Sequence, residues 1–154
     1  MKYLSPILFI LIVTSCSKLT NNGPVDGKWQ LCEVYSKPEA SASHYLATET
    51  TNRIPNAIFW NLQLKLLSIT SGKPLTPNCN EVVARFALNG STLHVGPTYM
   101  HFRDRDSLIT DPNTNTLTPV GINGCEATFQ VRRLNGSSMI LCSAVDSLVF
   151  RKLH

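Results

Sequence analysis

The stretch VVARFALNGSTLHV, residues 82–95, is typical of two strands joined by a tight turn. Asn89-Gly90 supplies residues that tolerate the positive φ angles of a two-residue hairpin turn. A turn at these two residues places Phe86 opposite Leu93. One face of the hairpin is then consistently apolar, as in a sheet that buries one side.

The same period of two continues on both sides of this hairpin. GKWQLCEVY (27–35), AIFWNLQLKLLSIT (57–70) and SLVFRKL (147–153) each predict one strand. The apolar faces of these strands are Trp29 and Leu31 in the first, Ile58, Trp60, Leu62, Leu64 and Leu66 in the second, and Leu148 and Phe150 in the third.

ATFQVRRLNGSSMILCSA (127–144) predicts a second hairpin around Asn135-Gly136, with two open registers. A two-residue turn places Ile140 and Cys142 on the face of Phe129 and Val131. A three-residue turn with Gly136 as the bulge residue places Met139 and Leu141 there instead.

About eight short strands in one small domain predict an all-β fold, either a closed antiparallel barrel or a sandwich. Closure is favoured because it removes exposed strand edges. The polar stretch Ser36 to Asn56 is too long for a hairpin and predicts a long loop directly after the first strand. Glu33 shares the face of Trp29 and Leu31. Either the strand twists out to solvent there, which we favour because a lone buried carboxylate is costly, or Glu33 reaches the mouth.

The N-terminus has the features of an export signal. The apolar run Leu4 to Val13 is shorter than the roughly 20 residues of a membrane-spanning helix. VTSC (13–16) resembles a bacterial lipobox, in which the cysteine carries a lipid and becomes the first residue. We expect residues 1–15 to form a removed signal peptide, residues 16–26 a flexible tether lipidated at Cys16, and residues 27–154 the barrel domain.

Four further cysteines follow Cys16, and two interpretations stay open. Exported proteins fold in an oxidising compartment, so an even number of cysteines predicts one or two disulfides. Free cysteines would instead be small buried apolar residues. The four are Cys32, Cys79, Cys125 and Cys142.

Catalytic and cofactor motifs are missing from the sequence, so we predict a protein that is not an enzyme and needs no cofactor. It contains neither a nucleophile elbow nor a phosphate-binding glycine loop. His94, His101, Asp104 and Asp106 could share one end of the barrel, but solvent-facing loop residues are the favoured interpretation, and we expect no metal site. The net charge of +4 falls by one with Lys2, and the scattered basic residues give no support to a nucleic-acid partner.

Gly27-Lys28-Trp29 at the start of the first strand resembles the Gly-x-Trp opening of lipocalins and their calycin relatives. FWNLQLKLLSI, VVARFALNGSTLHV, TPVGI and MILCSAVDSLVFRKL are similar to lipocalin-like lipoproteins of Bacteroidales bacteria. The resemblance implies a single up-and-down barrel of about eight strands. It also implies that Arg151 packs against Trp29 and closes one end. Surface export in this group is associated with acidic residues after the lipidated cysteine. CSKLT has none, which indicates the periplasmic face of the outer membrane.

Such a barrel is about wide enough to hold one small ligand or to be filled by side chains. We expect a small apolar ligand inside it, with Ser36 to Asn56 gating the mouth. The alternative is a solid barrel that works through its outer surface as an interaction module, complex subunit or inhibitor. The interior candidates are Trp29, Leu31, Leu62, Leu64, Phe86, Leu93, Phe129, Val131, Leu148 and Phe150.

Overall fold

The computed structural model describes residues 22–36 and 57–154, which form strands with two short 3-10 helices. The helices are η1 (Gly23–Val25) and η3 (Thr118–Val120). The strands are β1 (Gly27–Ser36), β2 (Phe59–Gln63), β3 (Leu66–Thr70), β4 (Glu81–Asn89), β5 (Thr92–His101), β6 (Asp106–Leu108), β7 (Ala127–Leu134), β8 (Ser138–Cys142) and β9 (Asp146–Leu153).

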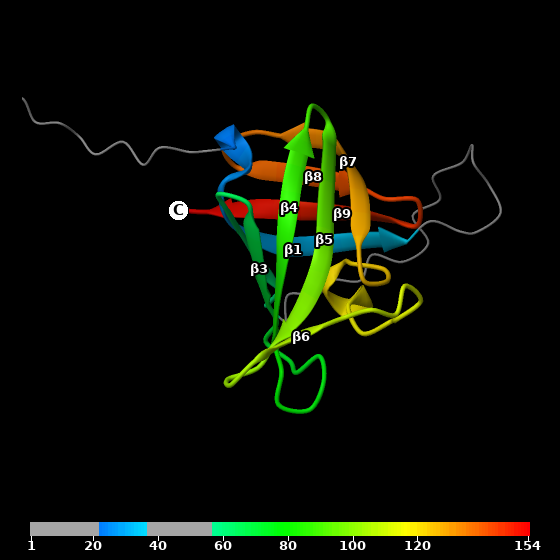
Figure 1. Cartoon of the computed structure of the whole chain (residues 1–154). Helices are drawn as coiled ribbons and strands as arrows, with labels where there is room; N and C mark the ends of the chain where they lie inside the picture. The colour runs from blue at the N-terminus through cyan, green and yellow to red at the C-terminus, as the bar shows by residue number, and fades with distance from the viewer. Residues whose placement is uncertain (1–21, 37–56) are drawn as a thin grey trace, which may run out of the picture.

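These strands close into an antiparallel barrel (Figure 1). The sheet order is β4-β3-β2-β1-β9-β8-β7-β5-β6, and an additional β4–β5 pairing closes the circle. Eight strands therefore form the barrel wall, and β6 extends the outer part of β5. The prediction of a single all-β, up-and-down barrel is confirmed, and closure protects every strand edge of the wall.

The two ends of this barrel differ in the connections that they contain. The turn end contains η1, the C-terminus and the tight turns between β2 and β3, β4 and β5, and β7 and β8. The loop end contains the β3–β4 connection (71–80), the segment 109–126 and the β8–β9 turn. In Figure 1 the arm formed by β6 and the end of β5 projects from the loop end beyond the barrel wall.

The central hairpin forms as predicted, but its turn lies one residue later. Asn89 pairs with Thr92 and Phe86 with Val95, so the turn residues are Gly90 and Ser91, not Asn89-Gly90. Gly90 has φ +59 and takes the left-handed conformation that this turn needs. The register shift is two residues, an even number, so the apolar face is unchanged.

The predicted strand over 57–70 is wrong, because it is two strands joined by a turn. Gln63 pairs with Leu66, and Leu64-Lys65 form the turn between them. The reversal transfers the buried positions to Leu67 and Ile69. Leu64 and Leu66, predicted to face the interior, are 55% and 56% exposed.

Two β-bulges determine the register of the second hairpin and the direction of the Glu33 side chain. A register shift between Val131 and Arg133 places Met139 and Leu141 in the core, as the second alternative predicted. The extra residue is Arg132, not Gly136. A shift between Leu31 and Glu33 likewise turns Glu33 off the core face, where it accepts a hydrogen bond from the Tyr35 hydroxyl.

The first strand begins at Gly27, the predicted start of the barrel domain, and the residues just before it also pack against the barrel. Val25 is fully buried, and Asn22 donates to the Asp26 carboxylate, so residues 22–26 belong to the folded domain and not to the tether. The predicted signal peptide and Cys16 lie outside the described residues, as does most of the predicted mouth loop. Within the described residues, no helix is long and apolar enough to cross a membrane.

Candidate functional site: the barrel interior and its two ends

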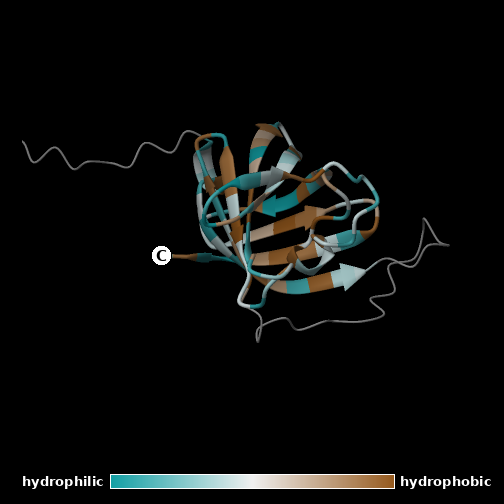
Figure 2. Cartoon of the chain, turned by 60° about the horizontal axis from the view of Figure 1, so that its bottom comes forward, coloured by the Kyte–Doolittle hydropathy of each residue, from teal (hydrophilic) through white to brown (hydrophobic). Residues whose placement is uncertain are grey.

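The strands bring most of the predicted interior residues together. Alternation along each strand places them on the inner face, and Figure 2 shows the matching alternation of hydrophobic and hydrophilic residues. Leu64 is the exception at the turn, and Val131 is partly buried beside the β7 bulge. The buried members are Trp29, Leu31, Leu62, Phe86, Leu93, Phe129, Leu148 and Phe150.

An aromatic cluster fills the middle of this interior. The Trp60 ring centroid lies 5.0 Å from that of Phe150 and 5.9 Å from that of Phe129, the latter in an edge-to-face arrangement. Trp60 has no exposed surface, and Phe129 and Phe150 are 1% exposed. These three aromatic side chains therefore pack against one another in the interior of the barrel.

The segment 117–122 closes the loop end from inside. Leu117, Val120 and Ile122 are fully buried, and the Trp60 indole donates to the Val120 carbonyl at 3.0 Å. Gly121 has φ +92, and a Cβ there would lie 2.8 Å from Cδ1 of Leu148. The segment therefore contacts the barrel core so closely that a side chain at Gly121 would collide.

Polar groups beneath this segment have partners within the protein. The fully buried Thr98 hydroxyl donates to the Cys125 carbonyl at 2.6 Å. The buried Asp146 carboxylate accepts from the Asn123 amide at 2.6 Å. These bonds join the residues that directly follow 117–122 to β5 and β9, and they give the buried polar groups their partners.

At the turn end, Trp29 lies under η1 and Lys152. Its indole donates to the Val25 carbonyl at 2.8 Å, and Lys152 Nζ lies 4.9 Å from its ring centroid. Lys152 also donates to the Pro24 carbonyl at 2.9 Å. Gly27 leaves room for this contact, because a Cβ there would lie 2.8 Å from Lys152 Cε.

The predicted Trp29–Arg151 pair is therefore wrong. Arg151 is exposed and donates to the Gln30 side chain at 2.9 Å. Strand alternation explains the difference, since neighbouring residues on β9 point to opposite faces. Lys152 pairs with Trp29 across the β1–β9 ladder, and Arg151 pairs with Gln30.

All four cysteines of the described chain are free thiols, so the free-cysteine alternative is supported over the disulfide one. Cys79 is buried, and its thiol lies 3.2 Å from the Glu81 carbonyl and 3.4 Å from that of His101. Cys142 lies 3.2 Å from the Ser147 hydroxyl. Cys32 and Cys125 are partly buried.

The predicted histidine and aspartate residues do not converge. His101 Nδ1 lies 2.6 Å from Asp106 Oδ1 across β5 and β6, whereas His94 contacts the Thr128 hydroxyl on the barrel wall. The hydrogen bond that the His101 imidazole donates to the Asp106 carboxylate is the main cause that raises the pKa of His101 above 6.5. Asp104 is exposed in the β5–β6 turn. Residues 22–36 and 57–154 contain no group of three His, Cys, Asp or Glu side chains suited to a metal.

Sequence reasoning missed the segment that closes the loop end. TLTPVGI (116–122) contains η3, with Pro119 in its first turn. A proline at the start of a helix and a following glycine were the available signal. Trp60 was predicted on the apolar face but not among the interior candidates, although it contacts Phe129, Phe150 and the Val120 carbonyl.

The model of a family described as a lipocalin-like domain matches residues 10–153. None of the curated proteins matches the chain.

Two solved structures resemble the fold. One is a lipocalin-like protein from Bacteroides uniformis ATCC 8492, with 20% identity and a TM-score of 0.55, covering 85% of this chain and 100% of that chain. The other is an uncharacterized protein from Bacteroides eggerthii DSM 20697, with 17% identity and a TM-score of 0.55, covering 83% of this chain and 98% of that chain. At these identities the likeness shows the fold.

Proposed function

This chain belongs to the lipocalin-like domain family, and from that premise we propose that it is a filled, non-enzymatic barrel that binds a protein partner through its outer surface. A lipid on Cys16 holds it at the periplasmic face of the outer membrane. The observation that carries the proposal is the packed interior. Trp60, Phe129 and Phe150 are buried inside the barrel and pack against one another, and a barrel of this size can be filled by its side chains.

The loop end is the surface that we assign to the partner. It presents the β5–β6 arm, the 71–80 connection and the β8–β9 turn, and binding residues are commonly carried on loops that a rigid scaffold positions. Leu108 on the arm and Val145 on the β8–β9 turn are 49% and 46% exposed, which is unusual for large apolar side chains in the described part of this chain. The tether enters at the opposite, turn end, so the loop end points away from the membrane.

A photo-crosslinking experiment in the native host tests this assignment. A photoreactive amino acid replaces Leu108 in one variant and Ala87, an exposed residue of the barrel wall, in the matched control. We expect one discrete protein adduct from position 108 and none from position 87. Equal adducts from both positions, or none from position 108, would contradict a partner at the loop end.

A second candidate function, binding of a small apolar ligand, is favoured by one specific feature. The side chains that close the loop end belong to the segment 117–122, which is not part of the barrel wall. Displacing it would open the core without breaking the strand ladder. Ligand binding by this route exposes the carbonyl of Val120 and the indole of Trp60, so it requires the ligand to replace their hydrogen bond.

A further inference from the structure

The turn end combines an exposed apolar tip with basic side chains. Leu64 and Leu66 are more than half exposed, and Lys65 lies between them. Arg85 pairs with Leu66 across the β3–β4 ladder. The exposed basic side chains in this half of the barrel are Lys28, Lys65, Arg85, Arg132, Arg133 and Arg151.

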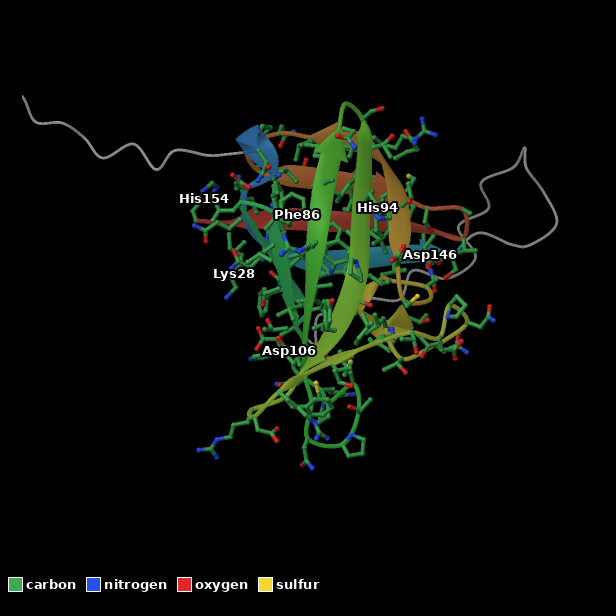
Figure 3. All side chains as sticks on the ribbon, viewed as in Figure 1. Lys28, Phe86, His94, Asp106, Asp146 and His154 are labelled. Carbon is green, nitrogen blue, oxygen red and sulfur yellow. The ribbon has the colours of Figure 1, made fainter. Side chains whose placement is uncertain are left out.

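Acidic side chains are distributed in the opposite way. The exposed ones in the described chain all belong to the loop end: Asp104, Asp106, Asp111 and Glu126. Asp26 at the turn end is partly buried and accepts hydrogen bonds from Asn22. In Figure 3 Asp106 lies on the arm that projects at the bottom of the view, and Lys28 lies beside the barrel wall above it. The turn end is therefore the positive end of the molecule.

The start of the described chain limits the distance between the turn end and Cys16. The Asn22 side-chain amide donates to the Leu64 carbonyl at 2.6 Å, so the tether joins the barrel at the apolar tip. Cys16 precedes Asn22 by six residues. An extended chain of that length spans about 20 Å at most. A lipid on Cys16 would hold the Leu64–Leu66 tip within that distance of the bilayer surface.

We propose that the β2–β3 turn is a second membrane contact, in which Leu64 and Leu66 enter the headgroup region of an anionic phospholipid bilayer and the surrounding basic side chains face its phosphates. This inference rests on the lipid anchor of the proposed function. A mixed apolar and cationic surface is the chemistry that binds a bilayer interface, where apolar burial and attraction to anionic lipids act together. The contact sets the orientation of the barrel, with the loop end pointing away from the membrane.

Fluorescence quenching in vesicles tests the contact on the full lipidated protein. Leu64→Trp provides a probe at the tip, and Val145→Trp provides a matched probe at the loop end. The native Trp29 and Trp60 are fully buried and give a constant background. The vesicles contain phosphatidylethanolamine and phosphatidylglycerol, with or without brominated acyl chains, and flotation of the same sample reports membrane binding.

We expect brominated lipid to quench most of the added emission of Leu64→Trp and none of that of Val145→Trp. Adding Lys65→Glu and Arg132→Glu should reduce the quenching, whereas Lys73→Glu with Arg103→Glu at the loop end should not. Equal quenching at both positions, or none at position 64 in protein that floats, would overturn the second contact and leave the anchor intact. Protein that does not float would overturn both.

Discussion

Lys152 closes the turn end because its position on β9 places it directly across from Trp29. Its ammonium group lies over the indole ring and donates to the Pro24 carbonyl, so one side chain joins β9, β1 and the segment before β1. Arg151, one residue earlier, points outward. A sequence shows that two basic residues end the last strand, but not which of them faces the tryptophan.

Replacing these neighbours separately tests that assignment. Lys152→Ala loses a cation–π contact and a hydrogen bond, and we expect it to lower the free energy of unfolding by about 1–2 kcal/mol. Arg151→Ala should change it by less than about 0.5 kcal/mol, as for most surface substitutions. Denaturant unfolding measures both. A larger cost for Arg151→Ala would contradict the structure.

The His101–Asp106 contact joins the two strands of the β5–β6 arm, so we expect the stability of this arm to depend on pH. The pKa of His101 is raised in the folded state, so the contact is fully formed below the ordinary value of 6.5 and is lost as pH rises through the raised value. We expect Asp106→Asn to lower the pKa of His101, measured by NMR titration of the imidazole. An unchanged pKa would show that the contact is not made in solution.

At the scale of elements, the period of two identified the strands but not their registers. The Asn89-Gly90 signal predicted the right hairpin with the turn one residue early, and Leu64-Lys65 formed a turn without glycine or proline to mark it. Leu64 takes φ 58 there, a conformation that no sequence rule assigns to leucine. The bulges at Cys32 and Arg132 are also not marked by any pattern in the sequence, because each depends on how its strand pairs with another strand.

The β7 bulge makes a direct prediction about buried positions. Met139 is fully buried and Ile140 is partly buried, as the bulged register requires. Met139→Ala should destabilise the protein by about 2–5 kcal/mol, the usual cost of truncating a large core residue. We expect Ile140→Ala to cost clearly less in the same unfolding experiment. The reverse order would mean that β8 presents its other face to the core.

Close packing of the 117–122 segment can be tested at Gly121. A methyl group there meets Leu148 Cδ1 at 2.8 Å with φ at +92, so we expect Gly121→Ala to destabilise the fold by about 1–3 kcal/mol. Gly136→Ala is the matched control, because nothing lies within 4 Å of its added methyl group. If the two variants have the same melting temperature, the segment does not pack against β9.

On the scale of the whole molecule, closure into a barrel was predictable and a packed interior was not. Alternation shows which side chains point inward, but a packed barrel and a hollow one have the same alternation. A packed barrel differs from a hollow one in the volume that its inward-facing side chains fill. Trp60 contacts Phe129 and Phe150 and donates to the Val120 carbonyl, which belongs to a segment 60 residues away. Charge is also arranged at this scale: the exposed acidic side chains of the described residues lie at the loop end, whereas six of their nine exposed lysine and arginine side chains lie in the half of the barrel at the turn end.

Native mass spectrometry of the mature protein, purified from its own host, tests the packed interior most directly. We expect one mass, that of the lipidated chain, which does not change when the protein is denatured. A discrete additional small-molecule mass that disappears on denaturation would contradict the packed interior. That result would make the barrel a carrier.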